Sequence, residues 1–186
     1  MIMKLHAKLE TVRYFKTMPS PVGTLTLVAS DKGLCAILWE NDDPERVRMG
    51  LLQEDKDHPM LCEAERQLQD YFVGKLERFT VPLDFDRGTD FQKKVWQALT
   101  TIPFGETRSY AQIAGQIGHP KAVRAVGAAN GKNPISIIAP CHRVIGSNGS
   151  LVGYGGGQPR KRWLLDHEQR GLQMSFETFT AAVDDR

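Results

Sequence analysis

The sequence is poor in cysteine and has no long apolar run. Its three cysteines, Cys35, Cys62 and Cys141, are odd in number and lack the spacing of a disulfide framework, which indicates a reducing compartment. No apolar run approaches the roughly 18 residues of a membrane span, and residues 1–10 contain no apolar signal core. These absences exclude a secreted disulfide scaffold and a membrane protein, so we expect a cytoplasmic protein with no membrane partner.

Neither sign of charge dominates the chain. The 186 residues include 24 Lys and Arg against 22 Asp and Glu, which gives a net charge of +2. With so weak a net charge, any contact with nucleic acid must rest on a local basic patch. Hydrophobic residues at 41% and charged residues at 25% are typical of a globular protein, and the length suits one large domain or two small ones.

The first half of the chain combines strand and helix patterns. Residues 12–15, 25–28 and 34–39 predict strands separated by turn residues, and residues 42–54 predict a short helix. Apolar residues spaced over 61–72 predict an amphipathic helix that ends at Gly74. A connector follows to residue 86, so we expect a small domain over residues 1–86.

Two capping boxes open helices in the second half. The first, Thr89 with Gln92, precedes an apolar face that ends at Pro103; the second, Ser109 with Gln112, opens a shorter helix. Another helix over residues 121–130 follows a tight turn. The pair predicts a helix-turn-helix, although two short helices are also common in packed bundles.

The second helix of this pair is small and basic. Small side chains would let its backbone approach another surface closely, and its cations could supply phosphate contacts or one inserted side chain. These features favour a DNA-binding face over a packed bundle. The residues concerned are Lys121, Arg124, Ala125, Gly127, Ala128 and Lys132.

Reactive side chains follow the apolar segment 135–139. Cys141, His142 and Arg143 stand in succession, an arrangement typical of an activated cysteine, because a nearby imidazole raises the thiolate fraction. Further on, residues 153–157 surround Tyr154 with glycines and predict a loop that approaches a ligand closely. The glycine spacing matches no phosphate loop or dinucleotide fingerprint, so we expect no cofactor.

These motifs resemble those of the O6-alkylguanine-DNA alkyltransferases, the methylated-DNA–protein-cysteine methyltransferases, of the constitutive bacterial type. The resemblance rests on residues 102–106, 109–110, 124–127, 133–134, 140–144, 153–154 and 163–168. It implies an α+β fold: a small N-terminal α/β domain of ribonuclease-H-like type over 1–86, then a mostly helical DNA-binding domain with a helix-turn-helix over 87–170. Residues 171–186 have no counterpart in this pattern and are expected to form a flexible tail.

The resemblance also implies roles for the residues around the thiol. It makes Cys141 the nucleophile, His142 the group that draws the proton through a bound water, and Glu168 the carboxylate that orients and charges the imidazole. Asn133 would bridge the segments around the thiol. A triad of this kind also suits a cysteine hydrolase, which would turn over.

For the base, the resemblance implies a pocket and a way into it. Tyr110 would donate to the departing guanine oxygen, and backbone groups of Cys141, Val144 and Gly155 would hold the base edge. Tyr154 suits either a pocket wall or a packing residue. Since the target atom lies inside the duplex, the nucleotide must be flipped out, and the resemblance makes Arg124 the side chain that fills the vacated stack from the minor groove.

The expected function is therefore DNA repair by irreversible transfer of an alkyl group from O6-alkylguanine, and more weakly from O4-alkylthymine, to Cys141. The partner is double-stranded DNA with alkylated bases, and the protein acts as a monomer with no obligate protein partner. No metal is expected, because His58 and Cys62, with Cys35 distant in sequence, do not make a ligand set. Besides the hydrolase, a DNA-damage sensor without chemistry is an alternative that the presence of Cys141 argues against.

Overall fold

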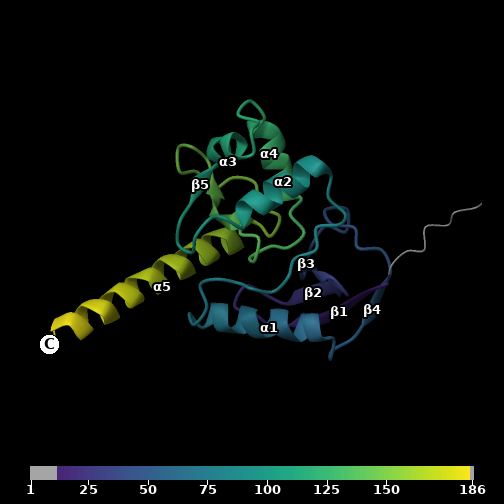
Figure 1. The fold of residues 1–186 in the computed structure, drawn as a ribbon, viewed down its shortest axis with the longest axis horizontal. Coiled ribbons are helices and arrows are strands. Elements are labelled where there is room, and N and C mark those ends of the chain that lie inside the picture. Colours follow the sequence, from purple (N-terminus) through teal and green to yellow (C-terminus); the bar gives the residue numbers. More distant parts are fainter. Residues whose placement is uncertain (1–11, 185–186) are drawn as a thin grey trace, which may run out of the picture.

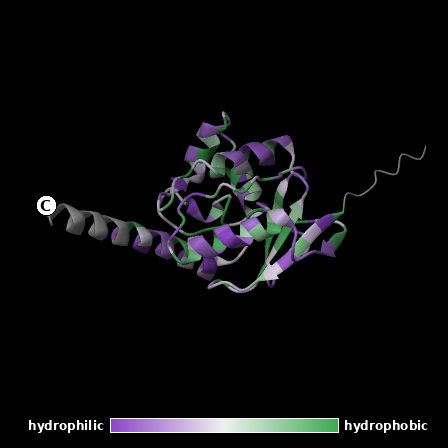
Figure 2. Ribbon diagram, turned by 60° about the horizontal axis from the view of Figure 1, so that its bottom comes forward, coloured by the Kyte–Doolittle hydropathy of each residue, from purple (hydrophilic) through white to green (hydrophobic). Residues whose placement is uncertain are grey.

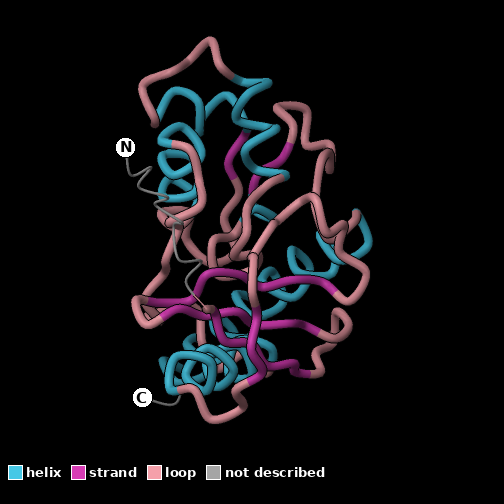
Figure 3. The backbone as a smooth tube through the Cα atoms, turned by 90° about the vertical axis from the view of Figure 1, so that its right-hand side faces the viewer, coloured by secondary structure: helices cyan, strands magenta, loops and turns pink. Residues whose placement is uncertain are grey.

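The computed structural model describes the backbone of residues 12–184 and the side chains of residues 12–173. A sheet with one long helix forms the N-terminal part, and a group of shorter helices lies against it, with a last helix projecting to one side (Figure 1). Figure 3 shows the longer strands side by side in one part of the molecule, next to helices, and two short strands among the helices and loops of the other part. The expected α+β class, with a small sheet domain before a helical region, is confirmed.

The N-terminal sheet has four strands in the order β3-β2-β1-β4. Strand β1 pairs antiparallel with β2 and parallel with β4, and β2 pairs antiparallel with β3. The bounds are β1 Arg13–Met18, β2 Leu25–Ser30, β3 Gly33–Trp39 and β4 Leu52–Glu54. The three strands expected from turn-bounded apolar runs are all present.

The prediction of a short helix over residues 42–54 is wrong. The segment forms turns and then the extended strand β4. Tertiary contacts override its helical pattern: the Asp42 carboxylate accepts from the backbone N–H of Trp39 and from Arg46, and Arg46 also reaches the carbonyl oxygen of Asn133.

Helix α1 (Pro59–Phe72) covers the sheet. Hydrophilic and hydrophobic residues alternate along it in Figure 2, and its apolar side is buried at Leu61, Ala64, Leu68 and Tyr71. Each buried leucine of this kind contributes roughly 1.5–3 kcal/mol relative to an exposed one. The helix therefore depends on the sheet for its stability more than on its own propensity.

The C-terminal part begins with the two helices whose capping boxes were expected. In α2, Thr89 accepts from Gln92 N–H at 3.2 Å and Gln92 accepts from Thr89 N–H at 2.9 Å. The same reciprocal bonds join Ser109 and Gln112 in α3. The elements are α2 Asp90–Leu99, β5 Arg108–Ser109, α3 Tyr110–Gln116, α4 Val123–Gly131, a one-turn helix Cys141–Arg143, β6 Val144–Ile145 and α5 Gln158–Asp184.

Helices α3 and α4 follow each other across a turn, which is consistent with the expected helix-turn-helix, but the second helix starts later than expected. Helix α4 begins at Val123 rather than Lys121, because the N–H of Ala122 closes a turn on the carbonyl oxygen of His119 at 2.8 Å. The indole N–H of Trp96 on α2 donates to Ala129 at 2.8 Å and ties α4 to the helix beneath it.

Segment 135–139 joins the two parts. Ile135, Ile137 and Ala139 are buried in the same apolar cluster as the strands and α1, and the N–H of Ile37 on β3 donates to Pro134 at 2.9 Å. The residues just before Cys141 are therefore fixed by the N-terminal sheet. Whether the parts divide at residue 86 stays a prediction.

Helix α5 runs on past residue 171 to Asp184 (Figure 1). The expected tail is thus helical to that residue, and its flexibility stays a prediction. Residues 1–11 of the expected first domain and the last two residues lie outside the described residues. Within the described chain, no helix is long and apolar enough to cross a membrane.

Candidate active site

Cys141 opens a one-turn helix at the end of a tightly held loop. The side-chain amide of Asn133 donates to Ala139 at 2.7 Å, and its oxygen accepts from Ile135 N–H at 3.1 Å. Within this clamp Ile137 takes a φ of +73°, a left-handed conformation that costs a β-branched residue of order 1–3 kcal/mol. The buried surroundings of Ile137 hold the strain, and the loop delivers the thiol in one position.

Cys141 is 2% exposed. Burial raises its pKa, and this effect exceeds the opposing influence of Asn133, Arg46 and Lys161. The resting side chain is therefore a thiol, not the enriched thiolate expected from the sequence. Its proton must leave during the attack, which requires a base.

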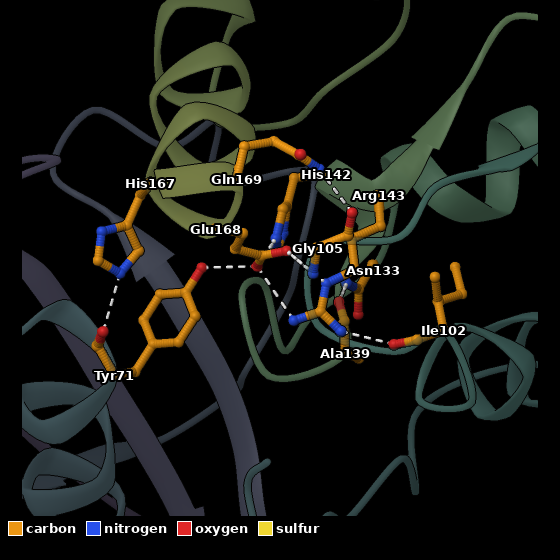
Figure 4. A network of polar contacts seen from close by, with 10 residues as sticks. All are labelled: Tyr71, Ile102, Gly105, Asn133, Ala139, His142, Arg143, His167, Glu168 and Gln169. Atoms are coloured by element: carbon orange, nitrogen blue, oxygen red, sulfur yellow. Dashed lines mark hydrogen bonds and ion pairs between the residues drawn. The ribbon is translucent and has the colours of Figure 1, made fainter. Parts of the chain in front are cut away.

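Glu168 is the centre of a buried polar cluster (Figure 4). Its carboxylate faces His142 Nε2 at 2.7 Å and receives two bonds from Arg143, at 2.9 and 3.0 Å. The hydroxyl of Tyr71 and the N–H of Gly105 add donors at 2.8 and 3.1 Å. Although burial opposes ionisation, His142 and Arg143 hold the pKa of Glu168 below its usual range, so it stays a carboxylate.

His142 is arranged as a proton acceptor. Burial lowers its pKa against the opposing effect of Glu168, so the ring is neutral in the resting protein. An ionised carboxylate can only accept, so the network assigns the ring proton to Nε2 and leaves Nδ1 with a free lone pair. Nδ1 is buried and has no hydrogen-bond partner among the described residues, as suits the atom that must take a proton.

Lys161 is a buried cation that the sequence analysis missed. Its ammonium donates to the carbonyl oxygens of Val144 and Val152 at 2.6 and 3.1 Å and lies 6.0 Å from the Tyr110 ring. Burial lowers its pKa to about 8, while the nearby Cys141 acts in the opposite direction. A signal existed, because Lys161 shares the inner face of α5 with Leu164 and Glu168 at helical spacing.

Arg46 was missed as well, and nothing in the sequence identifies it. Arg46 lies in the loop before β4. Its guanidinium donates to the carboxylate of Asp42 and, at 2.6 Å, to the carbonyl oxygen of Asn133. An added Cβ on Gly155 would lie 2.9 Å from its side chain. Arg46 therefore connects the N-terminal part, the loop clamp and the glycine-rich loop.

Of the expected base-holding residues, Val144, Tyr110 and Tyr154 belong to or pack against the apolar cluster that contains Cys141. Tyr110 donates to Val152 at 2.8 Å, and burial raises its pKa to about 12, so it remains a donor. The buried hydroxyl of Tyr154 has no hydrogen-bond partner among the described residues.

The expected DNA-contacting residues lie largely on one helix. Around α4, Lys121, Arg124, Ala125 and Ala128 are exposed, as is Lys132 beyond its end. Gly127 is half-buried and faces the Tyr110 ring, 3.9 Å from the position of an added Cβ. Gly127 thus brings the backbone of α4 close to Tyr110, one of the expected base-holding residues.

Comparison with known proteins places these features in one family. Residues 90–170 match the model described as "6-O-methylguanine DNA methyltransferase, DNA binding domain", and residues 13–85 match that of the same protein's ribonuclease-like domain. The chain belongs to the 6-O-methylguanine-DNA methyltransferase family. The expected family is confirmed, as is the enzyme class, a DNA repair protein that transfers an alkyl group to its own cysteine.

Relatives of this methyltransferase match over nearly their full length. The methylated-DNA–protein-cysteine methyltransferase of Mycolicibacterium paratuberculosis is 48% identical, over 89% of this chain and 98% of the relative. The constitutive enzyme of Bacillus subtilis is 44% identical, over 85% and 96%. The crystal structure of Mycobacterium tuberculosis OGT in complex with DNA aligns with a TM-score of 0.78 at 49% identity, over 85% of this chain and 94% of that one.

Proposed function

We propose that the protein repairs O6-alkylguanine in DNA by a single, irreversible transfer of the alkyl group to Cys141. One observation carries this proposal: the buried thiol of Cys141 is followed in the chain by a neutral His142. The Nε2 atom of His142 is bound to the carboxylate of Glu168, which leaves Nδ1 to accept a proton. Family membership supports the reaction, and this geometry supports Cys141 as its nucleophile and His142 as its base.

In the proposed reaction the Cys141 sulfur attacks the alkyl carbon as the bond from that carbon to the guanine oxygen breaks. The thiol proton passes to His142 Nδ1 through a bridging water, and Glu168 stabilises the imidazolium that forms. The bonding electrons of the broken bond go to the guanine oxygen. The proton taken from the thiol then passes from the His142 imidazolium, through solvent, to the base, which leaves as restored guanine. A thioether has no carbonyl for water to attack, so Cys141 is not regenerated.

Donors around the base stabilise the charge that develops on the departing oxygen. We assign this role to Tyr110, which must exchange its bond to Val152 for one to the base. Backbone groups of Val144 and Gly155 would hold the base edge, and Tyr154 would form a wall of the pocket. Lys161 would favour the negative charge that the sulfur gains as its proton leaves.

For DNA, we propose that α4 enters the minor groove and that Arg124 occupies the space of the flipped nucleotide. The exposed, small-residue face of α4 supports this, since a narrow groove admits little bulk. Lys121 and Lys132 would contact phosphates, while Ala125, Gly127 and Ala128 allow close approach. The same thiol would act more weakly on O4-alkylthymine.

The test is a count of repaired bases per protein. The protein is incubated with a molar excess of duplex containing O6-methylguanine, and restored guanine is quantified over time. The proposal requires repair to stop at one base per molecule. Continued turnover would contradict it in favour of a hydrolase, and tight binding without repair would indicate a damage sensor.

A further inference from the structure

Tyr71 lies on α1 in the N-terminal part, yet its hydroxyl reaches the centre of the Glu168 cluster. It donates at 2.8 Å to Glu168 Oε1, the oxygen that also faces His142 Nε2. Figure 4 shows Tyr71 and Arg143 approaching the carboxylate from opposite sides. Both Tyr71 and Glu168 are completely buried, so no solvent competes for this bond.

The position of Tyr71 is fixed by helix α5 as well as by its own helix. His167 Nε2 lies 2.8 Å from the backbone oxygen of Tyr71, and the ring of His167 meets the tyrosine ring edge-on with centroids 5.1 Å apart. Phe104 contacts the tyrosine ring from a further side, at 6.1 Å. The hydroxyl is therefore a preorganised donor.

This donor changes what Glu168 offers to the histidine. Three groups share Oε1, namely Tyr71, His142 and Arg143. A donor on an anion reduces the negative charge available to its other partners, so the tyrosine weakens the pull of Glu168 on a protonated imidazole. Burial and the neighbouring carboxylate raise the pKa of Tyr71 well above its usual value, so it remains a donor wherever the protein is folded.

We propose that Tyr71 is a positioning residue of the transfer site, which fixes the Glu168 carboxylate and moderates its pull on His142, the ring that accepts the Cys141 proton. The inference rests on the proposed function and deepens it. Through the hydroxyl of Tyr71, the N-terminal part of the chain would then influence the rate of alkyl transfer.

The variant Tyr71→Phe tests this, because it removes the hydroxyl and keeps the ring contacts. Two readouts are needed: the rate of alkyl transfer from free O6-benzylguanine across pH, and the titration of His142 followed by NMR of its imidazole nitrogens. We expect a rate about two- to tenfold lower, the scale of one hydrogen bond. We also expect a higher pKa for His142, because Glu168 regains charge, and an acid limb of the rate profile that moves to higher pH.

The matched control is Tyr14→Phe, the same chemical change at a tyrosine that stacks on His58. It should alter neither readout. If Tyr71→Phe slows transfer but leaves the His142 titration and the acid limb unmoved, the hydroxyl is merely structural and the proposal is wrong. Unchanged rates and titration overturn it equally.

If the phenylalanine variant does not fold, 3-fluorotyrosine at position 71 provides the complementary test. Fluorine makes the hydroxyl a stronger donor, so the His142 pKa must fall and the acid limb must move to lower pH; no movement overturns the proposal. Failure of the proposed function is distinct, because the wild-type protein would then transfer no alkyl group, while the His142 titration would still report on Tyr71.

Discussion

The ammonium of Lys161 lies 2.6 Å from the carbonyl oxygen of Val144, in a side chain with no solvent exposure. The bond holds a cation beside the segment that follows Cys141. Removal of a proton from the thiol makes the sulfur negative, so this cation should assist the reaction more than it assists the resting state. We therefore propose an electrostatic role in the reaction for Lys161, whose ammonium binds backbone carbonyl oxygens instead of a carboxylate.

Replacing Lys161 with Met should slow transfer from free O6-benzylguanine by about tenfold at pH 7, the effect of roughly one pKa unit on the thiol. The difference from wild type should shrink as pH rises past about 8, because the wild-type lysine then loses its own charge. Stopped-flow rates against pH provide the measurement. The exposed neighbour Arg162→Met is the control, and a rate difference that does not depend on pH would contradict a role for the charge.

Glu168→Gln should destabilise the folded protein as well as slow alkyl transfer. The change leaves the buried Arg143 without its carboxylate, and breaking a buried pair of this kind costs about 3–5 kcal/mol. Urea unfolding measures the loss, with the exposed Asp166→Asn on the same helix as the control. A loss below about 1 kcal/mol would show that the cluster contributes little to the fold.

Acid should remove the contribution of Glu168 in wild type. Its pKa in the folded state lies below the value of about 4.3 in an unfolded chain, so its stabilisation is fully present above that pH and declines as pH falls. The stability difference between wild type and Glu168→Gln should therefore be constant from pH 5 to 7 and should narrow below about pH 4. If the stability difference between wild type and Glu168→Gln stays constant down to pH 3, the stabilisation does not depend on the charge of Glu168.

Local sequence rules predict much of this fold but less of the site. The capping boxes at Thr89 and Ser109 involve neighbours within one turn, so their spacing was sufficient to place both helix starts. The segment around Arg46 was misjudged because its conformation depends on Asn133, 87 residues away. A local sequence pattern cannot predict a contact with a residue so far along the chain.

The site shows the same limit. Motif residues such as Cys141 and His142 are adjacent in sequence, so the resemblance to the family was enough to predict them as nucleophile and proton acceptor. Lys161 stands between the half-buried Arg160 and the exposed Arg162, so only its helical phase distinguishes the fully buried cation from its neighbours. The hydrogen bond from Tyr71 to Glu168 joins residues 97 positions apart, and no single-sequence pattern predicts it.

Arg124→Ala should separate base flipping from chemistry. Flipping a nucleotide costs a few kcal/mol, so loss of the side chain that fills the stack should slow repair in duplex at least about tenfold. Reaction with free O6-benzylguanine, which needs no flipping, should be nearly unchanged. Lys94→Ala, on α2, is the control for loss of one positive charge. Equal losses on both substrates would contradict the role of Arg124.

The central claim is that Cys141 is the acceptor and is used once. The most direct measurement is peptide mapping by mass spectrometry after reaction with an excess of duplex containing isotopically labelled O6-methylguanine. We expect one labelled methyl group per protein, on the peptide that contains Cys141, with Cys35 and Cys62 unlabelled. Repaired DNA with an unlabelled Cys141, or a label on another residue, would contradict it.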